Sequence, residues 1–202
     1  MCWLALIFMG VGGAGGSGAP DVARVEEDWE VVLNEPEQNL NAPQFHTFMS
    51  PFDHIDSYHF QVRWNHHEAP NYDSGGVQIQ AWSGEDEAGM RNYREDELSS
   101  SAETIRWTQV LSTQNGQLRF QIDNGTSETW GSFGGSETSL TGAVGVWSLN
   151  QYNTYVSLEN SIVSFGANRI DMLRITAVRR YQADGTLISE DKNPKVVFQY
   201  VD

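Results

Sequence analysis

The sequence predicts an all-β protein: two antiparallel sheets packed as a jelly-roll sandwich, with little or no helix after the leader. Apolar and polar residues alternate with period two through several short runs, which is the pattern of strands with one buried and one wetted face. Asn115-Gly116 and Asn124-Gly125 interrupt these runs, and Asn-Gly favours the positive φ angles of a type I′ hairpin turn. The 19 glycines and the 11% aromatic share also suit short strands joined by tight turns.

The leader is an apolar run from Cys2 to Val11, which has the length of a signal-peptide core and is too short to span a bilayer. Ser17-Gly18-Ala19 supplies the small-x-small pattern that a signal peptidase cuts. We therefore expect a signal peptide at 1–19 and a secreted, periplasmic or cell-surface protein whose mature chain does not insert into a membrane. No Lys or Arg precedes the run, which indicates a truncated start. A disordered or cloning-derived tail is the alternative.

Length and net charge limit the number of domains and the possible partners of the remaining residues. The 202 residues suit a single sandwich domain at 20–202. The formal net charge is −15, from 12 basic and 27 acidic residues. A surface of that sign repels phosphate backbones, which excludes nucleic acid as a partner. The acidity indicates either a well-hydrated surface or carboxylates that bind Ca²⁺. Cys2 is the single cysteine, so no disulfide is expected in the mature chain.

In the first half of the chain the strand pattern is clearest at 58–65 and 77–82. Both runs place apolar residues on one face; the opposite face of the first run carries His59, Gln61 and Arg63. A short strand is expected at 30–33, and three prolines argue against long strands between 34 and 57. Residues 84–101 are interpreted as an acidic loop, in which 89–98 is the only candidate for a short helix.

The second half continues the pattern. A strand at 104–111 leads through Asn115-Gly116 into the run that begins at Leu118. Further strands are expected at 143–148, 155–158, 161–165, 169–181, 186–189 and 195–201. If Asn124-Gly125 is a two-residue turn, its register pairs Arg119 with Trp130 and Gln121 with Glu128, and these residues share a face.

Two indoles therefore fall on polar strand faces. Trp82 alternates with Gln78 and Gln80, and the hairpin register places Trp130 beside Arg119. An indole flanked by amides and carboxylates can stack on a sugar ring while its neighbours bind the hydroxyls. The alternative is packing, with Trp130 lying on Arg119 as a cation–π pair. The predicted ligand-binding residues are Trp82, Gln78, Gln80, Trp130, Arg119, Gln121 and Asp123.

The paired runs YHFQVRW with GGVQIQAW and LRFQIDNG with TWGSFGG resemble the concanavalin A-like lectin/glucanase superfamily, which includes laminin-G-like modules. The resemblance covers most of residues 25–202. It implies a two-sheet jelly roll whose concave sheet or edge loops bind glycans, frequently with Ca²⁺. It carries over no functional residue.

Other chemistry finds less support in the sequence. All five histidines lie between His46 and His67, but their spacing does not suit a compact metal site. Glu26, Asp28 and Glu30 alternate as a catalytic strand would, yet their flanks indicate a solvated edge strand, so no catalytic residue is predicted. We expect a non-catalytic module that binds a polysaccharide or cell-surface glycan. A polysaccharide hydrolase or lyase of the same fold and a purely structural or adhesive surface protein are the alternatives.

Overall fold

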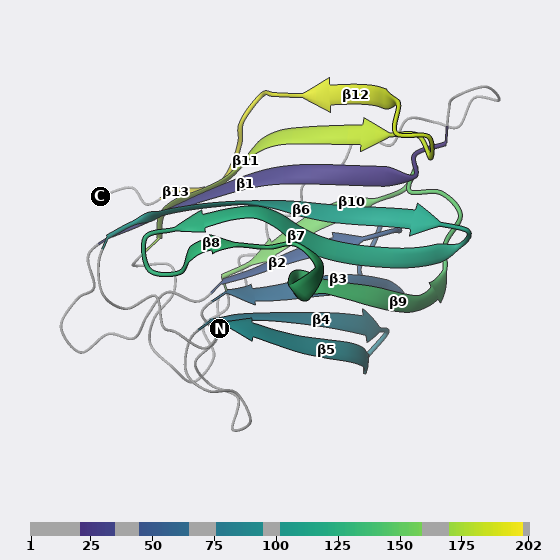
Figure 1. Ribbon diagram of the computed structural model, residues 1–202, viewed down its shortest axis with the longest axis horizontal. Helices are drawn as coiled ribbons and strands as arrows, with labels where there is room; N and C mark the ends of the chain where they lie inside the picture. Colours follow the sequence, from purple (N-terminus) through teal and green to yellow (C-terminus); the bar gives the residue numbers. More distant parts are fainter. Residues whose placement is uncertain (1–20, 35–44, 65–75, 95–101, 159–169, 200–202) are drawn as a thin grey trace.

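A computed structural model of the chain describes residues 21–34, 45–64, 76–94, 102–158 and 170–199 (Figure 1). They form two antiparallel sheets and one short 3-10 helix, η1, at Ser136–Thr138. This confirms the prediction of an all-β protein with two sheets. No helix in these ranges is long and apolar enough to cross a membrane. The predicted leader at 1–19 and the predicted strand at 161–165 lie outside the described residues.

The large sheet contains β1 (Arg24–Leu33), β6 (Thr104–Gln114), β7 (Gln117–Ser127), β8 (Gly131–Phe133), β9 (Ser139–Gly145), β11 (Ile170–Tyr181), β12 (Leu187–Asp191) and β13 (Lys195–Gln199). Their order is β12-β11-β1-β6-β7-β8, with β13 beside β11 and β9 beside β7. The small sheet contains β2 (Phe45–Ser50), β3 (Tyr58–Trp64), β4 (Val77–Ser83), β5 (Asp86–Arg94) and β10 (Asn153–Ser157). Their order is β10-β2-β3-β4-β5. Figure 1 shows the strands of both sheets running roughly along the long axis, with β12 and β5 at opposite edges.

The sheets pack face to face over buried aromatic rings. Trp107 of β6 stacks on Trp29 of β1 with ring centroids 5.9 Å apart, and its ring centroid lies 4.1 Å from that of Trp64 of β3 in the facing sheet. Phe60 of β3 stacks on Phe120 of β7 at 5.3 Å, a second contact between the sheets. All five rings are buried. They therefore supply much of the apolar area that folding removes from water.

Two sequence signals are confirmed. The alternation at 58–65 and 77–82 appears as β3 and β4, which are antiparallel neighbours with Val62 opposite Ile79 and Gln61 opposite Gln80. Asn115 and Gly116 have φ angles of 53° and 77° and form the turn between β6 and β7. Both central residues of a type I′ turn need such angles.

The predicted two-residue turn at Asn124-Gly125 is wrong. β7 runs through this dipeptide to Ser127, and the positive φ of Asn124 accompanies a register shift between β7 and β6 instead. A bulge of this kind needs a residue that tolerates positive φ just as a turn does, so the dipeptide alone does not distinguish them. The chain reverses later, and Gly125 pairs with Phe133 rather than lying in a turn.

The true reversal is held by Glu103, a buried carboxylate just before β6. Its Oε2 accepts hydrogen bonds from the backbone N–H groups of Glu128 and Thr129 at 2.7 and 3.2 Å, and from Ser127 Oγ at 2.6 Å. Trp130 then enters the core at 4% exposure. Its ring centroid lies 5.7 Å from that of Phe133. The predicted placement of Trp130 on a polar face beside Arg119 is therefore wrong.

Three further elements differ from the sequence interpretation. The predicted acidic loop contains β5, and residues 89–94 are strand rather than helix. β5 is the edge of the small sheet, where charged residues are tolerated because one side remains in water. Residues 45–50, expected to be irregular between prolines, form β2. β1 is a central strand, between β6 and β11, and not an edge strand.

Replacing Gly125 by Ala tests the corrected register. A Cβ at Gly125 would lie 2.4 Å from the Phe133 ring, whereas a Cβ at the strand glycine Gly89 would meet Leu140 at an ordinary 3.6 Å. We expect Gly125→Ala to lower the free energy of unfolding by about 1–3 kcal/mol, the usual effect of overpacking. Gly89→Ala is expected to change it by less than about 0.5 kcal/mol. Urea unfolding measures both, and equal stabilities would contradict the pairing of Gly125 with Phe133.

Candidate functional site

The outer face of the small sheet carries a group of amide side chains. Because β3 and β4 alternate, Gln61, Gln78 and Gln80 point away from the core. Strand pairing sets Gln61 beside Gln80 and Gln78 beside Asn92 of β5. The three glutamines are buried although they lie outside the core. We call Gln61, Gln78, Gln80 and Asn92 the amide face.

Hydrogen bonds order the amide face. Gln78 Nε2 donates to Asn92 Oδ1 at 2.9 Å, and Arg63 Nη1 donates to Gln78 Oε1 at 3.3 Å. Gln80 Nε2 donates to Glu87 Oε2 at 2.9 Å. These bonds fix the orientations of the Gln78 and Gln80 amides.

Aromatic rings lie around the amide face. Phe48 of β2 pairs with Gln61 on one side and with Tyr155 of β10 on the other, and His59 of β3 pairs with Trp82 of β4. The Phe48 and His59 ring centroids are 5.6 Å apart. Trp82 is partly buried. The surface thus combines flat apolar rings with groups that both donate and accept hydrogen bonds.

Two buried polar atoms on this surface, Gln80 Oε1 and Trp82 Nε1, have no hydrogen-bond partner among the described residues. One is an acceptor and the other a donor, and they lie two positions apart on the same face of β4. A buried polar group without a partner costs about 1–3 kcal/mol. The thioether of Met90, itself 49% exposed, lies 3.8 Å from Gln80 Nε2 and covers that amide. Methionine is flexible, so this cover can move.

His59 is neutral at this surface. Burial lowers the pKa of its imidazole, and its Nδ1 donates to the Ile55 carbonyl at 2.8 Å. The second ring nitrogen, Nε2, is then an acceptor. Among the described residues, no three His, Cys, Asp or Glu side chains gather as metal ligands would.

The seven predicted ligand-binding residues do not form one site. Trp82, Gln78 and Gln80 come together on the small sheet as expected. Gln121 and Asp123 lie on the outer face of the large sheet, where Gln121 Nε2 donates to Asp123 Oδ1 at 2.6 Å, and Arg119 is exposed on the same face. Trp130 is in the core.

Sequence reasoning missed Phe48, His46 and Tyr155 on the small sheet. The period-two pattern of FHTFM at 45–49 was the available signal for β2. Tyr155 falls within a predicted strand, but only the pairing of β10 with β2 brings it to this surface.

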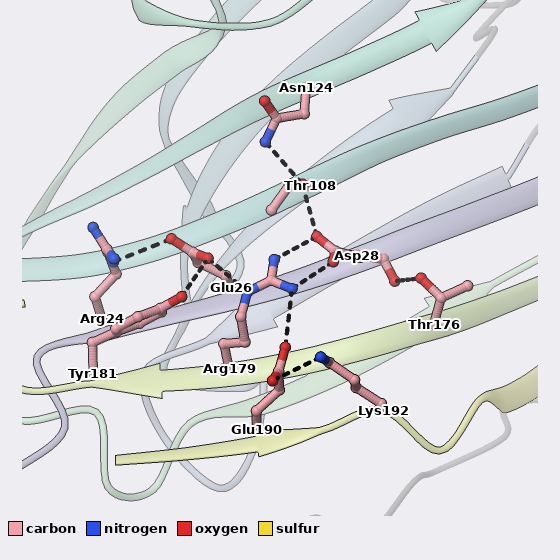
Figure 2. A network of polar contacts seen from close by, with 10 residues as sticks. All are labelled: Arg24, Glu26, Asp28, Thr108, Asn124, Thr176, Arg179, Tyr181, Glu190 and Lys192. Carbon is pink, nitrogen blue, oxygen red and sulfur yellow. Dashed lines mark hydrogen bonds and ion pairs between the residues drawn. The ribbon is translucent and has the colours of Figure 1, made fainter. Parts of the chain in front are cut away.

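The outer face of the large sheet is a ladder of ion pairs (Figure 2). Glu26, Asp28 and Glu30 alternate along β1, as predicted, but arginines from neighbouring strands neutralise all three. Arg179 of β11 donates to both oxygens of Asp28 at 2.6 and 2.7 Å and to Glu26 at 2.9 Å. Glu30 pairs with Arg106 and Arg174, each at 2.6 Å. Paired in this way, the three carboxylates are structural groups rather than free acids or bases.

A different carboxylate, Glu27, points inward from the same strand and is wholly buried. Its Oε2 accepts from Trp29 Nε1 at 3.0 Å, Thr154 Oγ1 at 3.3 Å and Gln109 Nε2 at 3.4 Å. Gln109 Oε1 in turn accepts from Thr47 Oγ1. The bonds from Thr154 of β10 and Thr47 of β2 therefore connect the small sheet to the large one.

Burial raises the pKa of Glu27 to about 7, against the lowering effect of these hydrogen bonds and of the charge on Lys195. The neighbouring Tyr152 hydroxyl also has a raised pKa, first through burial and then through the Glu27 charge, and the Arg180 guanidinium lies over its ring. Desolvation favours the uncharged form of both groups. Burial therefore favours the protonated form of Glu27 up to a higher pH than for an exposed carboxyl.

No family pattern matches the chain, and no curated protein matches it. Among solved structures, the chain is similar to a scytalido-glutamic peptidase with a transition-state analogue inhibitor. The identity is 11%, the match covers 89% of this chain and 84% of that chain, and the TM-score is 0.36. At that score the likeness carries no argument about activity.

Glu27→Gln is expected to remove a pH dependence of stability. The pKa is about 7 in the folded chain and near the ordinary 4.5 when unfolded, so the folded state binds more protons between these values. The wild type therefore loses stability as the pH rises through that window. Near pH 4.5 the variant and the wild type should be equally stable, and at about pH 8 the variant should be more stable by up to ~3 kcal/mol. Urea unfolding at the two pH values measures the difference.

Glu30→Gln is the matched control on the outward side of the same strand. This substitution removes the carboxylate that pairs with Arg106 and Arg174, so it should destabilise the protein at about pH 8. A stabilising effect of Glu30→Gln, or a parallel pH profile for wild type and Glu27→Gln, would contradict the assignment.

Proposed function

We propose that this protein is an exported, non-catalytic module that binds a neutral glycan on the amide face. The observation that carries the proposal is the Gln80 acceptor and the Trp82 donor, which lie two positions apart on β4, have no partner among the described residues and are rimmed by aromatic rings. A sugar hydroxyl is both donor and acceptor, so the hydroxyl groups of a glycan can offer a partner to each of these atoms.

The composition of the surface supports this ligand class. Carboxamides pair with hydroxyl groups without imposing a charge, and the amide face carries four of them. The rings of Phe48, Trp82 and Tyr155 offer apolar area against which the C–H face of a pyranose packs. Small ligand sites in general combine apolar lining with a few oriented polar groups.

Charge favours a neutral ligand over an ionic one. The chain has a net charge of −15, which repels acidic polysaccharides at long range. On the surface itself Arg63 and Glu87 bear opposite charges, and each is hydrogen-bonded to an amide of the face. Neither sign dominates locally, so recognition rests on hydroxyls and ring stacking.

The hydrolase alternative has less support on this surface. Glycoside hydrolysis uses two carboxyl groups about 5–9.5 Å apart. Glu87 is the one carboxylate bonded to the amide face among the described residues, and the three alternating acids of β1 lie on the other sheet as ion pairs.

Export, jelly-roll connectivity, the concanavalin A-like resemblance and a role for Ca²⁺ stay predictions. A Ca²⁺-dependent rise in thermal stability that EDTA reverses would support the last of these.

Trp82→Ala and Gln80→Ala are expected to weaken binding to a neutral polysaccharide. Wild type and variants are compared by affinity electrophoresis in gels that contain mixed-linkage β-glucan, xylan or galactomannan, with alginate as the acidic comparison. Loss of the stacking ring or of the unpaired acceptor should lower the affinity by roughly 10-fold, the equivalent of about 1.4 kcal/mol.

Gln121→Ala is the matched control, because Gln121 is also an outward glutamine but lies on the large sheet. It is expected to bind as the wild type does. If Gln121→Ala weakens binding and Gln80→Ala does not, the ligand face is on the other sheet. If wild type binds none of the neutral polysaccharides, or releases reducing ends from them, the proposal is wrong.

A further inference from the structure

Trp147 is the most exposed large hydrophobic residue in the described part of the chain, at 77%. Trp29, Trp64, Trp107 and Trp130 are all buried, so the core of this protein readily accommodates indoles. An indole in water forgoes the free energy that its burial would contribute. Its placement outside therefore needs an explanation.

The backbone around Trp147 is firmly held. The Val146 N–H donates to the Gly116 carbonyl at 3.0 Å, and the Val146 carbonyl accepts from Thr113 Oγ1. Two residues further on, the Leu149 N–H donates to the Val22 carbonyl at 2.7 Å, and the Leu149 side chain is buried. Trp147 thus stands between two anchored residues rather than in a loose loop.

The ring itself has a fixed support. It lies against Gly116, where a Cβ would come within 2.9 Å of the ring atoms Cε2 and Cζ2. Gly116 has a φ of 77° in the turn between β6 and β7, so the same glycine makes the turn and makes room for the ring. One side of the indole is therefore backed by the turn, and the rest faces water.

The two segments that hold this indole contain no charged residue, although Asp21 bonds to one of them: its Oδ1 accepts from Asn150 Nδ2 at 3.2 Å. Neither 113–117 (TQNGQ) nor 145–151 (GVWSLNQ) contains an acidic, basic or His residue, although the whole chain has a net charge of −15. Gln114, Asn115 and Gln117 are exposed or nearly so on the turn that supports the ring. A flat apolar plate edged by carboxamides suits an uncharged ring with hydroxyl groups at its edge.

We propose that Trp147 and the amide-bearing turn 114–117 form a second carbohydrate contact, one that stacks on a neutral sugar ring. It lies beside the turn between β6 and β7, at one end of the large sheet, and uses no residue of the amide face, so it is tested separately from the amide face. A second copy of the chain is a poorer occupant, because one indole and three amides offer far less than the ~800 Å² per partner of a stable dimer. An anionic membrane is also a poorer occupant, because neither 113–117 nor 145–151 contains a Lys or Arg.

Trp147→Ala and Trp147→Phe separate stacking from general structure. Both change an exposed side chain, so the midpoint of urea unfolding should stay close to that of the wild type. In the same electrophoresis with mixed-linkage β-glucan, xylan and galactomannan, Trp147→Ala should bind about 5-fold more weakly in the Trp82→Ala background as well as alone. Trp147→Phe, which keeps a ring, should retain most of the affinity. The bound polysaccharide should also protect Trp147 from oxidation by N-bromosuccinimide. Mass spectrometry of the peptide that contains Trp147 measures the oxidation.

The outcomes distinguish the two contacts. Weaker binding in Trp82→Ala with unchanged binding in Trp147→Ala would overturn this inference and leave the amide face standing. The reverse result would overturn the amide face and support the Trp147 contact. Oxidation of Trp147 at the same rate with and without saturating polysaccharide would overturn it, as would a dimer in sedimentation that Trp147→Ala abolishes. Wild type that binds none of the three polysaccharides would overturn both.

Discussion

The packing of four indoles between two sheets is the constraint on which the rest of the molecule depends. Trp107 contacts Trp29 beside it and Trp64 across the interface, so the inward sides of β1, β6 and β3 are fixed together. Side chains alternate between the two faces of a strand. A shift of the strand register by one residue would therefore point each indole toward the solvent and bring polar groups into the core. The register that buries the rings therefore also fixes which residues face outward. The amide face is the outward half of the strands whose inward half makes the core.

The same alternation gives the acids of β1 two chemical environments. Outward, Glu26, Asp28 and Glu30 meet arginines of β6 and β11 or of their own strand, which supply a counter-charge to each carboxylate. Inward, Glu27 has no arginine, and its Oε1 has no hydrogen-bond partner among the described residues. Desolvation then favours the protonated acid. Protonation removes the cost of the buried charge, while Oε2 can still accept from the groups that join the sheets.

Local pattern predicted what depends on local geometry. The alternation in 58–64 and 77–82 correctly placed Gln78, Gln80 and Trp82 on one face, because side-chain direction in a strand has a fixed period. Prediction from local pattern failed where a residue distant in the sequence determines the local structure. Asn124-Gly125 is compatible with a turn and with a bulge, and the choice falls to a later turn that Glu103 holds through long-range hydrogen bonds. β2 was missed because prolines on both sides masked its alternation, and with it the rings that complete the candidate site. The hairpin register of Trp130 failed for the same reason, since burial among Trp64 and Phe133 outweighs a local turn preference.

Two indoles outside the core, Trp82 and Trp147, imply a particular kind of ligand. Trp82 lies on β4 of the small sheet, whereas Trp147 follows β9 and packs on the turn between β6 and β7 of the large sheet. The two share no described contact, so a short oligosaccharide would engage one or the other with the modest affinity of a single stacking contact. A polymer presents many equivalent rings. Once one ring is held, the next binding event occurs at a raised effective concentration, provided that the chain can reach the second site. If it cannot, the two contacts hold separate chains, and the protein becomes a cross-link between them. In both geometries weak individual contacts suffice for binding to the polymer. This is consistent with two small contacts that lie apart on the protein.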